Sequence, residues 1–384
     1  MATTASIPVQ DSNPVAAVQG FLRDVLATDD IHGVLVPVHL GRGGTPMLSL
    51  VTDPAELDNA DPLAPAFPLN GAKTLARLTH GHSGEGIAAV LRSCEIRAFL
   101  ELVKLNQGSL DEVVLIGIDC LGAYRNPHYL RFLEVGDDDP IRTTLGFLGR
   151  TGGAKDTARD GYDVAGACRV CEYPAPMGAD VTIGILGVDL AAALPVMADT
   201  PKGEALLARL ELADTEPDKA REEALAELTA RRIEARDAMF AATSEATDSL
   251  EKLAAYLSGC VNCYNCRVAC PVCYCKECVF VTDVFDHKPW QYLGWARQKG
   301  VLKLPTDTVF YHLTRMAHMS TACVGCGQCS NACPNEVPVM ELFRTVAAAT
   351  QAGFDYLPGR DLEEPPPLSV FHENEFQEVV SHLA

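Results

Sequence analysis

Residues 260–271 read Cys260-Val-Asn-Cys263-Tyr-Asn-Cys266-Arg-Val-Ala-Cys270-Pro271, and residues 323–334 repeat the spacing as Cys323-Val-Gly-Cys326-Gly-Gln-Cys329-Ser-Asn-Ala-Cys333-Pro334. Three thiolates on one short loop hold three corners of an iron-sulfur cube, and the cysteine before the proline ligates the other cube of the pair. Two such runs in one chain predict a ferredoxin-like domain with two 4Fe-4S clusters.

The exchange of the fourth cysteine gives each predicted cluster four ligands. One set is Cys260, Cys263, Cys266 and Cys333; the other is Cys323, Cys326, Cys329 and Cys270. The alternatives are structural zinc, whose ribbons use two cysteine pairs separated by a longer spacer, and disulfides, which fit such closely spaced cysteines less well in a large chain.

Composition limits the class of protein. The chain has 384 residues, of which 48% are hydrophobic and 7% aromatic, enough for two or three domains with a sizeable core. Its net charge of -20 disfavours binding to nucleic acid or to anionic lipid. No apolar run has the length of a signal peptide or a membrane span, so we expect no membrane insertion and a cytoplasmic location, which agrees with the many thiols.

The region 15–200 has the pattern of an α/β domain. Short apolar, β-branched runs predict strands at 33–38, 87–91, 113–118 and 181–186. A helix follows Cys94, because Ile96, Phe99, Leu100 and Val103 recur at helical spacing.

Three further regions are expected after this domain. Residues 201–255, rich in alanine, leucine, arginine and glutamate, predict a helical connector that acts as a spacer with solvated faces. The ferredoxin-like domain takes 256–345 and contains a 52-residue insertion, 271–322, that covers a cluster or contacts a partner. The proline-rich segment 346–384 predicts an extended C-terminal arm lying on a surface, with a disordered tail as the alternative.

A third cysteine group belongs to the α/β domain. Cys94 and Cys120 each follow a predicted strand, and a right-handed crossover brings the carboxyl ends of parallel strands to one edge of the sheet, where ligands bind. Cys168 and Cys171 add a pair with metal-loop spacing. From spacing alone, the four cysteines form a third cluster, a zinc half-site or a redox pair.

Several motifs in the same domain resemble one known family: Asp61-Pro-Leu-Ala-Pro-Ala-Phe-Pro-Leu-Asn70-Gly-Ala, Arg92-Ser-Cys94-Glu-Ile-Arg97-Ala, Gly117-Ile-Asp-Cys120-Leu-Gly122 and Cys168-Arg-Val-Cys171. The chain resembles, from about residue 15 to its tail, the beta subunit of deazaflavin-reducing hydrogenase and formate dehydrogenase. A double-cluster domain placed after the α/β domain is similar to the formate dehydrogenase branch.

This resemblance implies a flavoprotein that binds FAD near a 4Fe-4S cluster and exchanges hydride with the deazaflavin coenzyme. It implies that the α/β domain is flavin-binding and favours a third cluster on Cys94, Cys120, Cys168 and Cys171. The resemblance also implies that FAD is not held by a Gly-x-Gly-x-x-Gly run, which this sequence lacks. The glycine-rich stretches Gly41–Gly44 and Gly81–Gly86 are either loose substitutes for that run or plain turns.

Five candidate FAD contacts lie near strand ends, because the two phosphates of FAD need cations or amide donors: Asn70, Lys73, Thr74, Arg92 and Arg97. Asp119, beside Cys120, is a sixth candidate, which would position the flavin ribose. Alternatively, the two arginines pair with Glu95 and Glu101 on a helix surface, and Asp119 caps a turn.

A flavin joins hydride chemistry, which moves two electrons, to clusters that carry one. The chain is therefore expected to be an oxidoreductase subunit that takes hydride from deazaflavin coenzyme or NAD(P) and passes electrons to or from a partner. That partner is a catalytic subunit of formate dehydrogenase or hydrogenase, or a heterodisulfide reductase-type subunit, because no motif here resembles a molybdenum or nickel-iron site. The alternative is a flavin-free ferredoxin-type adaptor.

Cys273, Cys275 and Cys278 match no standard cluster loop. We expect them to pack near the clusters, with replacement of Cys270 as a ligand as the alternative.

Overall fold

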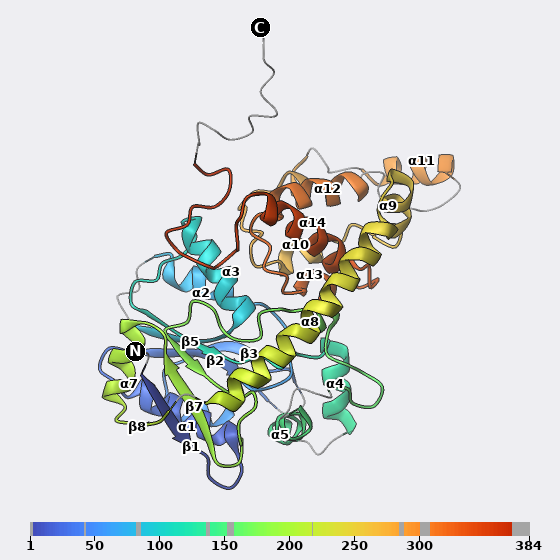
Figure 1. Cartoon of the computed structure of the whole chain (residues 1–384). Helices are drawn as coiled ribbons and strands as arrows, with labels where there is room; N and C mark the ends of the chain where they lie inside the picture. The colour runs from blue at the N-terminus through green and yellow to red at the C-terminus, as the bar shows by residue number, and fades with distance from the viewer. Residues whose placement is uncertain are drawn as a thin grey trace.

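The computed structural model describes residues 3–41, 44–81, 86–135, 139–151, 157–216, 218–283, 288–299 and 308–370. An α/β domain is joined by a long helix to a smaller helical region that contains both cysteine runs (Figure 1). Within the described ranges, no helix is both long and apolar enough to cross a membrane.

Eight strands form one mixed sheet, in the spatial order β3 (Met47–Val51), β2 (Gly33–Val38), β4 (Ile87–Arg92), β5 (Val113–Ile118), β6 (Val181–Ile183), β7 (Ala193–Ala198), β1 (Thr4–Pro8) and β8 (Ala213–Asp214). The four strands from β2 to β6 are parallel, and those outside them are antiparallel to their neighbours. Strands β1 and β8 lie outside the range 15–200 expected for this domain.

The predicted strands at 33–38 and 113–118 have the bounds of β2 and β5, and β4 is one residue longer than predicted. Strand β6 ends three residues earlier than its apolar run. The reason is that the carboxylate of Asp119 accepts hydrogen bonds from the backbone N–H groups of Ile185 and Leu186. A side chain thus replaces a neighbouring strand as the acceptor.

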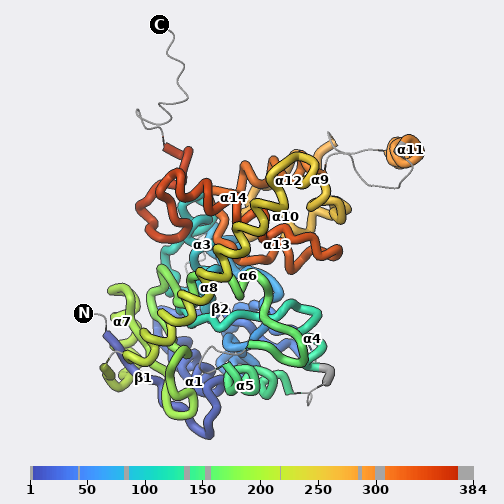
Figure 2. Tube along the Cα trace, turned by 45° about the vertical axis from the view of Figure 1, so that its right-hand side comes forward, coloured from blue at the N-terminus to red at the C-terminus, as the bar shows by residue number. Residues whose placement is uncertain are grey.

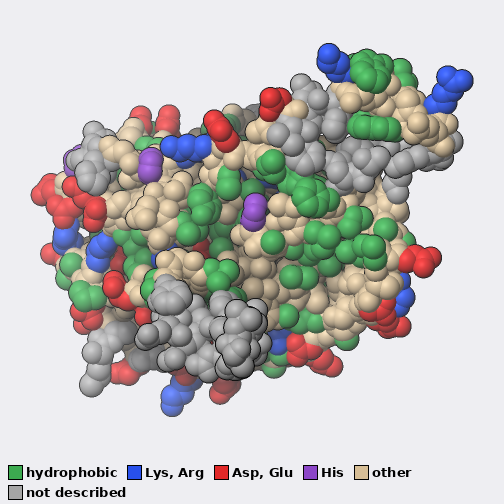
Figure 3. All heavy atoms as spheres, turned by 90° about the horizontal axis from the view of Figure 1, so that it is seen from above, with side chains coloured by type: hydrophobic (Ala, Val, Ile, Leu, Met, Phe, Trp, Pro, Cys, Tyr) green, Lys and Arg blue, Asp and Glu red, His purple; other side chains and the backbone are tan. Residues whose placement is uncertain are grey.

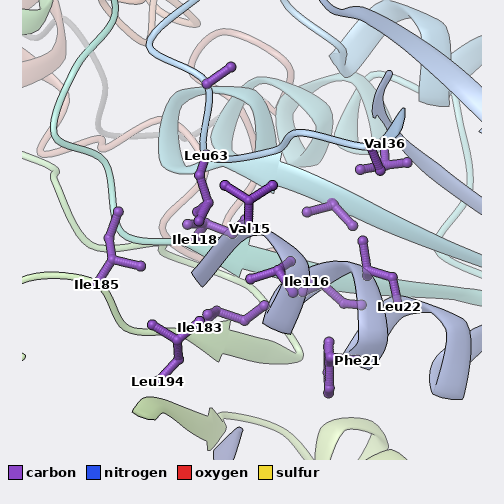
Figure 4. Packing of buried hydrophobic residues seen from close by; sticks show 14 of the residues in the cluster. Val15, Phe21, Leu22, Val36, Leu63, Ile116, Ile118, Ile183, Ile185 and Leu194 are labelled. Atoms are coloured by element: carbon purple, nitrogen blue, oxygen red, sulfur yellow. The ribbon is translucent and has the colours of Figure 1, made fainter. Parts of the chain in front are cut away.

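Helices cover both faces of the sheet because successive strand residues point to opposite sides. Helices α1 (Pro14–Leu26) and α5 (Pro140–Thr151) cover one face, where Phe21 and Leu22 pack with Val36 and Ile116 (Figure 4). Helices α2 (Ala72–Thr79) and α3 (Ser93–Lys104) cover the other.

The core on the α2–α3 face continues into the cysteine region. Phe99 of α3 belongs to the same buried cluster as Val324 and Phe343, which lie beyond residue 320. The two regions therefore share one core, and the cysteine runs are held against this face of the α/β domain.

The other helices of the α/β domain are η1 (Pro54–Asn59), α4 (Asn126–Val135), α6 (Gly166–Arg169) and α7 (Pro201–Arg209). Helix α8 (Lys219–Ala246) runs from the sheet to the cysteine region, where α9 (Leu250–Tyr256) follows it (Figure 2). Since α7 packs on β7 and α8 packs on α6, the range 201–255 is not a separate spacer.

The cysteine region contains α10 (Asn265–Ala269), η2 (Val279–Val281), α11 (Pro289–Lys299), α12 (Thr308–Met319), α13 (Gln328–Asn331) and α14 (Val339–Gly353). Helix α11 of the insertion projects from the body, and its Trp290 is 68% exposed (Figure 2). Helix α14 continues to Gly353, so the first residues of the predicted arm are helical; residues 371–384 of that arm lie outside the described residues.

Candidate iron-sulfur and flavin sites

The two cysteine runs adopt the same local conformation. Asn262 and Tyr264 have positive φ angles of 50° and 61°, and Gly325 and Gly327, at the equivalent positions, have φ of 70° and 75°. These left-handed residues curl the backbone, and α10 or α13 begins directly after each curl. The repeated spacing therefore produces a repeated loop with three cysteines along it.

The first predicted set of ligands is gathered in one place. Burial raises the pKa of the Cys260 thiol, and the neighbouring Cys266, Cys333 and Cys263 raise it further. Cys333 comes from the second run and still lies near enough to Cys260 to affect its pKa, as the predicted exchange of the fourth cysteine requires.

The second predicted set is gathered in the same way. Burial raises the pKa values of the Cys326 and Cys329 thiols, and in both cases Cys270 of the first run is the next cause. Burial likewise raises the pKa of Cys270, and Cys323 adds to the rise. Buried thiols this close together are costly unless a positive group neutralises their thiolates.

Helix α12 of the insertion supplies polar groups to the first set. Nη1 of Arg315 donates to Sγ of Cys266 at 3.1 Å, and its Nη2 donates to the carbonyl of Cys266 at 3.1 Å. Nε2 of His312 lies 3.3 Å from Sγ of Cys260. One part of the insertion therefore lies against the predicted cluster position.

Arg315 is 3% exposed and lies between the two sets, since Cys266, Cys270 and Cys329 all raise its pKa against the effect of burial. Arg315 was not among the site residues predicted from the sequence. Arg315 follows His312 by three residues and Tyr311 by four, and this helical spacing on one face was the signal in the sequence that could have identified it.

The four cysteines of the third group line a single cavity. Cys94 is the second residue of α3, and Cys120 follows β5. Cys168 lies on α6, and Cys171 lies just after it. Burial raises the pKa of the Cys168 thiol to about 11, with Cys120 as the next cause. Among the described residues, no three His, Cys, Asp or Glu side chains form a group able to hold a single metal ion.

Two cations face this cavity. Burial raises the pKa of the Cys120 thiol, whereas Arg92 and Arg232 lower it. Arg232 belongs to α8 and donates to the carbonyls of Cys120 at 3.2 Å and Leu121 at 2.9 Å. Arg232 was not predicted from the sequence, although Arg221 and Arg232 are eleven residues apart and share one face of the helix.

The third group is adjacent to the second set. Cys326 lines the third group's cavity, and after burial it is the main cause of the raised pKa of Cys94. The three groups of cysteines therefore form a continuous series, from the edge of the sheet through Cys326 to Arg315 and Cys266.

The six predicted flavin contacts do not all meet in one cavity, although Arg92 and Asp119 line one together. Arg92 lines a hollow at the carboxyl ends of β2 and β4 together with Pro37, Pro46 and Phe67, and it also lines the cavity of the third cysteine group. Its Nη2 donates to the carbonyl of Ala64 at 2.7 Å, and its guanidinium lies 4.9 Å from the centre of the Phe67 ring. Arg92 thus separates the hollow from the third group.

The other five candidates lie elsewhere or have protein partners. The Asn70 side chain accepts from the Ala72 N–H at 3.0 Å and Thr74 is exposed, while Lys73 lines a different pocket. Burial lowers the pKa of Lys73, against the raising effect of Cys270 and Cys273, and Arg77 and Arg267 lower it further.

Arg97 and Asp119 have structural partners. Arg97 is buried and donates from Nε to the carbonyl of Pro358 at 2.9 Å, rather than to a carboxylate of its own helix as in the alternative interpretation. Asp119 forms a two-pronged ion pair with Arg221 at 2.8 and 2.6 Å. Of the glycine loops, Arg42, Gly43 and residues 82–85 lie outside the described residues.

The three unassigned cysteines lie beside the first two sets. Burial raises the pKa of the Cys273 thiol to about 11, and Cys270 is the next cause. Cys278 packs against a buried cluster that includes Cys266 and Tyr311, whereas Cys275 is exposed.

Comparisons with known proteins agree with this geometry. The 4Fe-4S binding domain family matches residues 318–339, which include the second cysteine run. The chain is 26% identical over 79% of its length to the F420-dependent formate dehydrogenase subunit beta of Methanocaldococcus jannaschii, covering 80% of that protein. It is 29% identical over 73% of its length to the F420-dependent formate dehydrogenase 1 subunit beta of Methanococcus maripaludis, covering 75% of that protein.

Among solved structures, the chain is similar to one chain of the F420-reducing [NiFe] hydrogenase complex from Methanosarcina barkeri, studied as a xenon derivative. The TM-score is 0.46 and the sequence identity 14%, and the match covers 65% of this chain and 94% of the hydrogenase chain. The two curated relatives confirm the resemblance predicted from the sequence: this chain is a homologue of the beta subunits of F420-dependent formate dehydrogenase.

Proposed function

We propose that this chain is the iron-sulfur flavoprotein subunit of an oxidoreductase complex, which exchanges hydride with a soluble carrier at FAD and passes single electrons through 4Fe-4S clusters to or from a catalytic subunit. The observation that supports it best is the continuous series of three cysteine groups, whose end near the sheet adjoins the hollow beside Arg92.

The residues present fit the clusters. Each of the three groups has four cysteines, and buried thiols of raised pKa become stable thiolates when they ligate iron. Arg315 and Arg232 place positive charge close to these sulfurs or to the adjoining carbonyls. Such charges and hydrogen bonds raise the reduction potential of a cluster.

The hollow beside Arg92 is the candidate position for part of a flavin. Its lining is mostly apolar, with proline, leucine and phenylalanine side chains, and it lies at the carboxyl ends of parallel strands, where α/β sheets bind ligands. A bound flavin supplies the exchange between two-electron hydride and one-electron chemistry. The Arg92 guanidinium is a cation between this hollow and the third cysteine group, and its contacts with the Ala64 carbonyl and the Phe67 ring hold it in place.

The carrier and the partner are inferred from the relatives. Both curated relatives are named as F420-dependent formate dehydrogenase subunits, which favours the deazaflavin coenzyme over NAD(P) and a formate dehydrogenase catalytic subunit as partner. The cysteine region also offers a surface for a partner. Hydrophobic side chains gather on the face seen in Figure 3, and exposed ones in this part of the chain are Val261, Val268, Tyr274, Val279, Val281, Trp290, Leu293, Phe310 and Leu313.

The test is anaerobic quantification of FAD, iron and sulfide in the reconstituted chain, with reduction by F420H2 and by NADH measured on the same sample. We expect about twelve iron atoms and one FAD per chain, as three four-iron clusters and one flavin require, and faster bleaching of the flavin by F420H2. About eight iron atoms without flavin would instead identify a ferredoxin-type adaptor. Reduction by NADH alone would overturn the choice of carrier.

A further inference from the structure

A second pocket lies on the α2–α3 side of the molecule, between α2 and the segment that follows α10. It is lined by Lys73, Ala76, Arg77, His80, Leu102, Gln107, Arg267, Val268, Cys273, Tyr274, Cys275 and Lys276. It shares no lining residue with the hollow beside Arg92. Lys73, predicted as a flavin contact, lies in this pocket instead.

The charge of the lining is opposite to that of the chain. The pocket contains Lys73, Arg77, Arg267 and Lys276, and no aspartate or glutamate is among the described residues that line it. The chain as a whole carries a net charge of -20. Four cations gathered on a strongly acidic protein repel one another, and this arrangement is stabilised when an anion binds between them.

The described carboxylates do not neutralise these cations, although the thiols of Cys270 and Cys273 raise the pKa of Lys73. Within the described ranges, none of the four forms an ion pair with a carboxylate. The Lys73 ammonium donates to the carbonyl of Val268 at 3.3 Å. The Nε–H of Arg267 is buried without any hydrogen-bond partner among the described residues. A buried donor without an acceptor costs free energy, so Arg267 is held in the lining without a described protein acceptor for this group.

We propose that this pocket binds a small polyanion that carries at least two phosphate or carboxylate groups. The concave lining favours a small molecule that enters the pocket over an acidic patch of a protein that lies across it. Because the pocket is separate from the flavin hollow, the proposal does not depend on flavin binding.

The test uses inorganic pyrophosphate, titrated calorimetrically into the reconstituted holoprotein at about 0.15 M salt, where long-range charge effects are screened. We expect one pyrophosphate per chain, bound at least about tenfold more tightly than inorganic phosphate because two anionic groups meet several cations. FAD and iron are measured before and after the titration.

The variant is Arg77→Gln combined with Lys276→Gln, since both side chains are exposed and their loss leaves the core intact. It is expected to raise the Kd for pyrophosphate by at least about tenfold while FAD and iron stay unchanged. Arg297→Gln, an exposed position on the projecting helix α11, is the matched control and leaves the Kd unchanged.

Two results overturn the proposal. One is an absence of pyrophosphate binding, or binding that the double variant does not weaken relative to the control. The other is release of one FAD for each pyrophosphate bound, which would show that the anion enters the flavin site. Since FAD content and hydride reduction are recorded on the same sample, failure here is distinguishable from failure of the proposed function.

Discussion

Single side chains decide the environment of the sulfurs in the cysteine region. Arg315 is buried between two sets of cysteines and donates to Sγ of Cys266 at 3.1 Å. A cation and hydrogen-bond donor at this place stabilises the additional negative charge that a cluster gains on reduction.

Replacing Arg315 with Gln removes that charge and is expected to lower the reduction potential of the cluster on the first cysteine set. One charged hydrogen bond of about 1.4 kcal/mol corresponds to about 60 mV for one electron. The measurement is an anaerobic redox titration followed by electron paramagnetic resonance, with Arg297→Gln as the control. An unchanged potential in a variant that keeps its full iron content would contradict this role.

Cys270 and Cys273 are two neighbouring thiols for which the crossing of the fourth cysteine predicts different results. After burial, Cys270 is the main cause of the raised pKa values of Cys326 and Cys329, so Cys270→Ser is expected to remove about four iron atoms per chain. Cys273→Ser is expected to keep them. Iron and sulfide analysis checks both variants, and the reverse outcome would identify Cys273 as the ligand.

At the scale of the element, helix α8 supports the edge of the sheet. Arg221 pairs with Asp119 at the end of β5, and Arg232 binds the carbonyls of the next two residues. One face of a helix rich in alanine and charge therefore holds the loop that carries Cys120.

Arg221→Gln is expected to destabilise the fold, because it leaves the carboxylate of Asp119 buried and without its cation. Breaking one partner of a buried pair costs about 3 kcal/mol. Thermal or denaturant unfolding of the anaerobic protein measures the loss, and Lys219→Gln, an exposed cation at the start of the same helix, is expected to have little effect. Equal stability of the two variants would mean that the ion pair contributes nothing.

The segment after α14 is held on α3 by buried polar contacts. The Tyr356 hydroxyl lies 2.7 Å from each carboxylate oxygen of Glu101, and the Gly359 N–H donates to Oε1 of Glu101 at 2.8 Å. Gly359 has a φ of 76°, and an added Cβ would lie 2.6 Å from Cα of Arg97. This place requires glycine both for its conformation and for the close approach.

Gly359→Ala is expected to loosen this contact by about 1–3 kcal/mol, because an L side chain is strained at positive φ and meets the Arg97 backbone. Hydrogen exchange of the amides of residues 356–359 measures the loosening. Gly353→Ala at the end of α14 is the matched control, since it has open space around it and no positive φ. Equal exchange in both variants would refute the argument.

At the scale of the whole molecule, the two regions are joined beside the third cysteine group. Arg344 of α14 donates to the carbonyl of Val170 at 2.6 Å and pairs with Glu172, which also binds Arg236 of α8 at 3.2 Å. Burial by itself raises the pKa of Glu172, but the two arginines outweigh it and hold that pKa below its ordinary value.

This joint is expected to depend on pH. A carboxyl group whose pKa is lowered in the folded protein contributes stability that is present above its unfolded pKa and is lost as pH falls through the folded pKa. The difference in Tm between the wild type and Glu172→Gln is therefore expected to be constant above about pH 5.5 and to shrink below about pH 4.5. A difference that grows as the pH falls would contradict the sign of this argument.

Local patterns in the sequence predicted a large part of the architecture. The bounds of β2 and β5 follow from apolar runs that are buried on both faces of a parallel sheet, and α3 follows from apolar residues at helical spacing. Where a distant side chain intervened the prediction failed, as at β6, which Asp119 terminates. The candidate flavin residues were selected by type alone, and the fold places Arg97, Asp119 and Lys73 in three different environments.

By itself, the sequence determined the two cysteine loops, because loop conformation and spacing depend on residues within a dozen positions of one another. The exchange of the fourth cysteine between the two runs stays a prediction. The tertiary structure decided which cations face the sulfurs and how the three cysteine groups adjoin. Arg232 is 112 residues from Cys120, and Arg315 is 49 residues from Cys266. Contacts over such separations depend on how helices pack on the sheet and on one another, and spacing along the chain does not specify that packing.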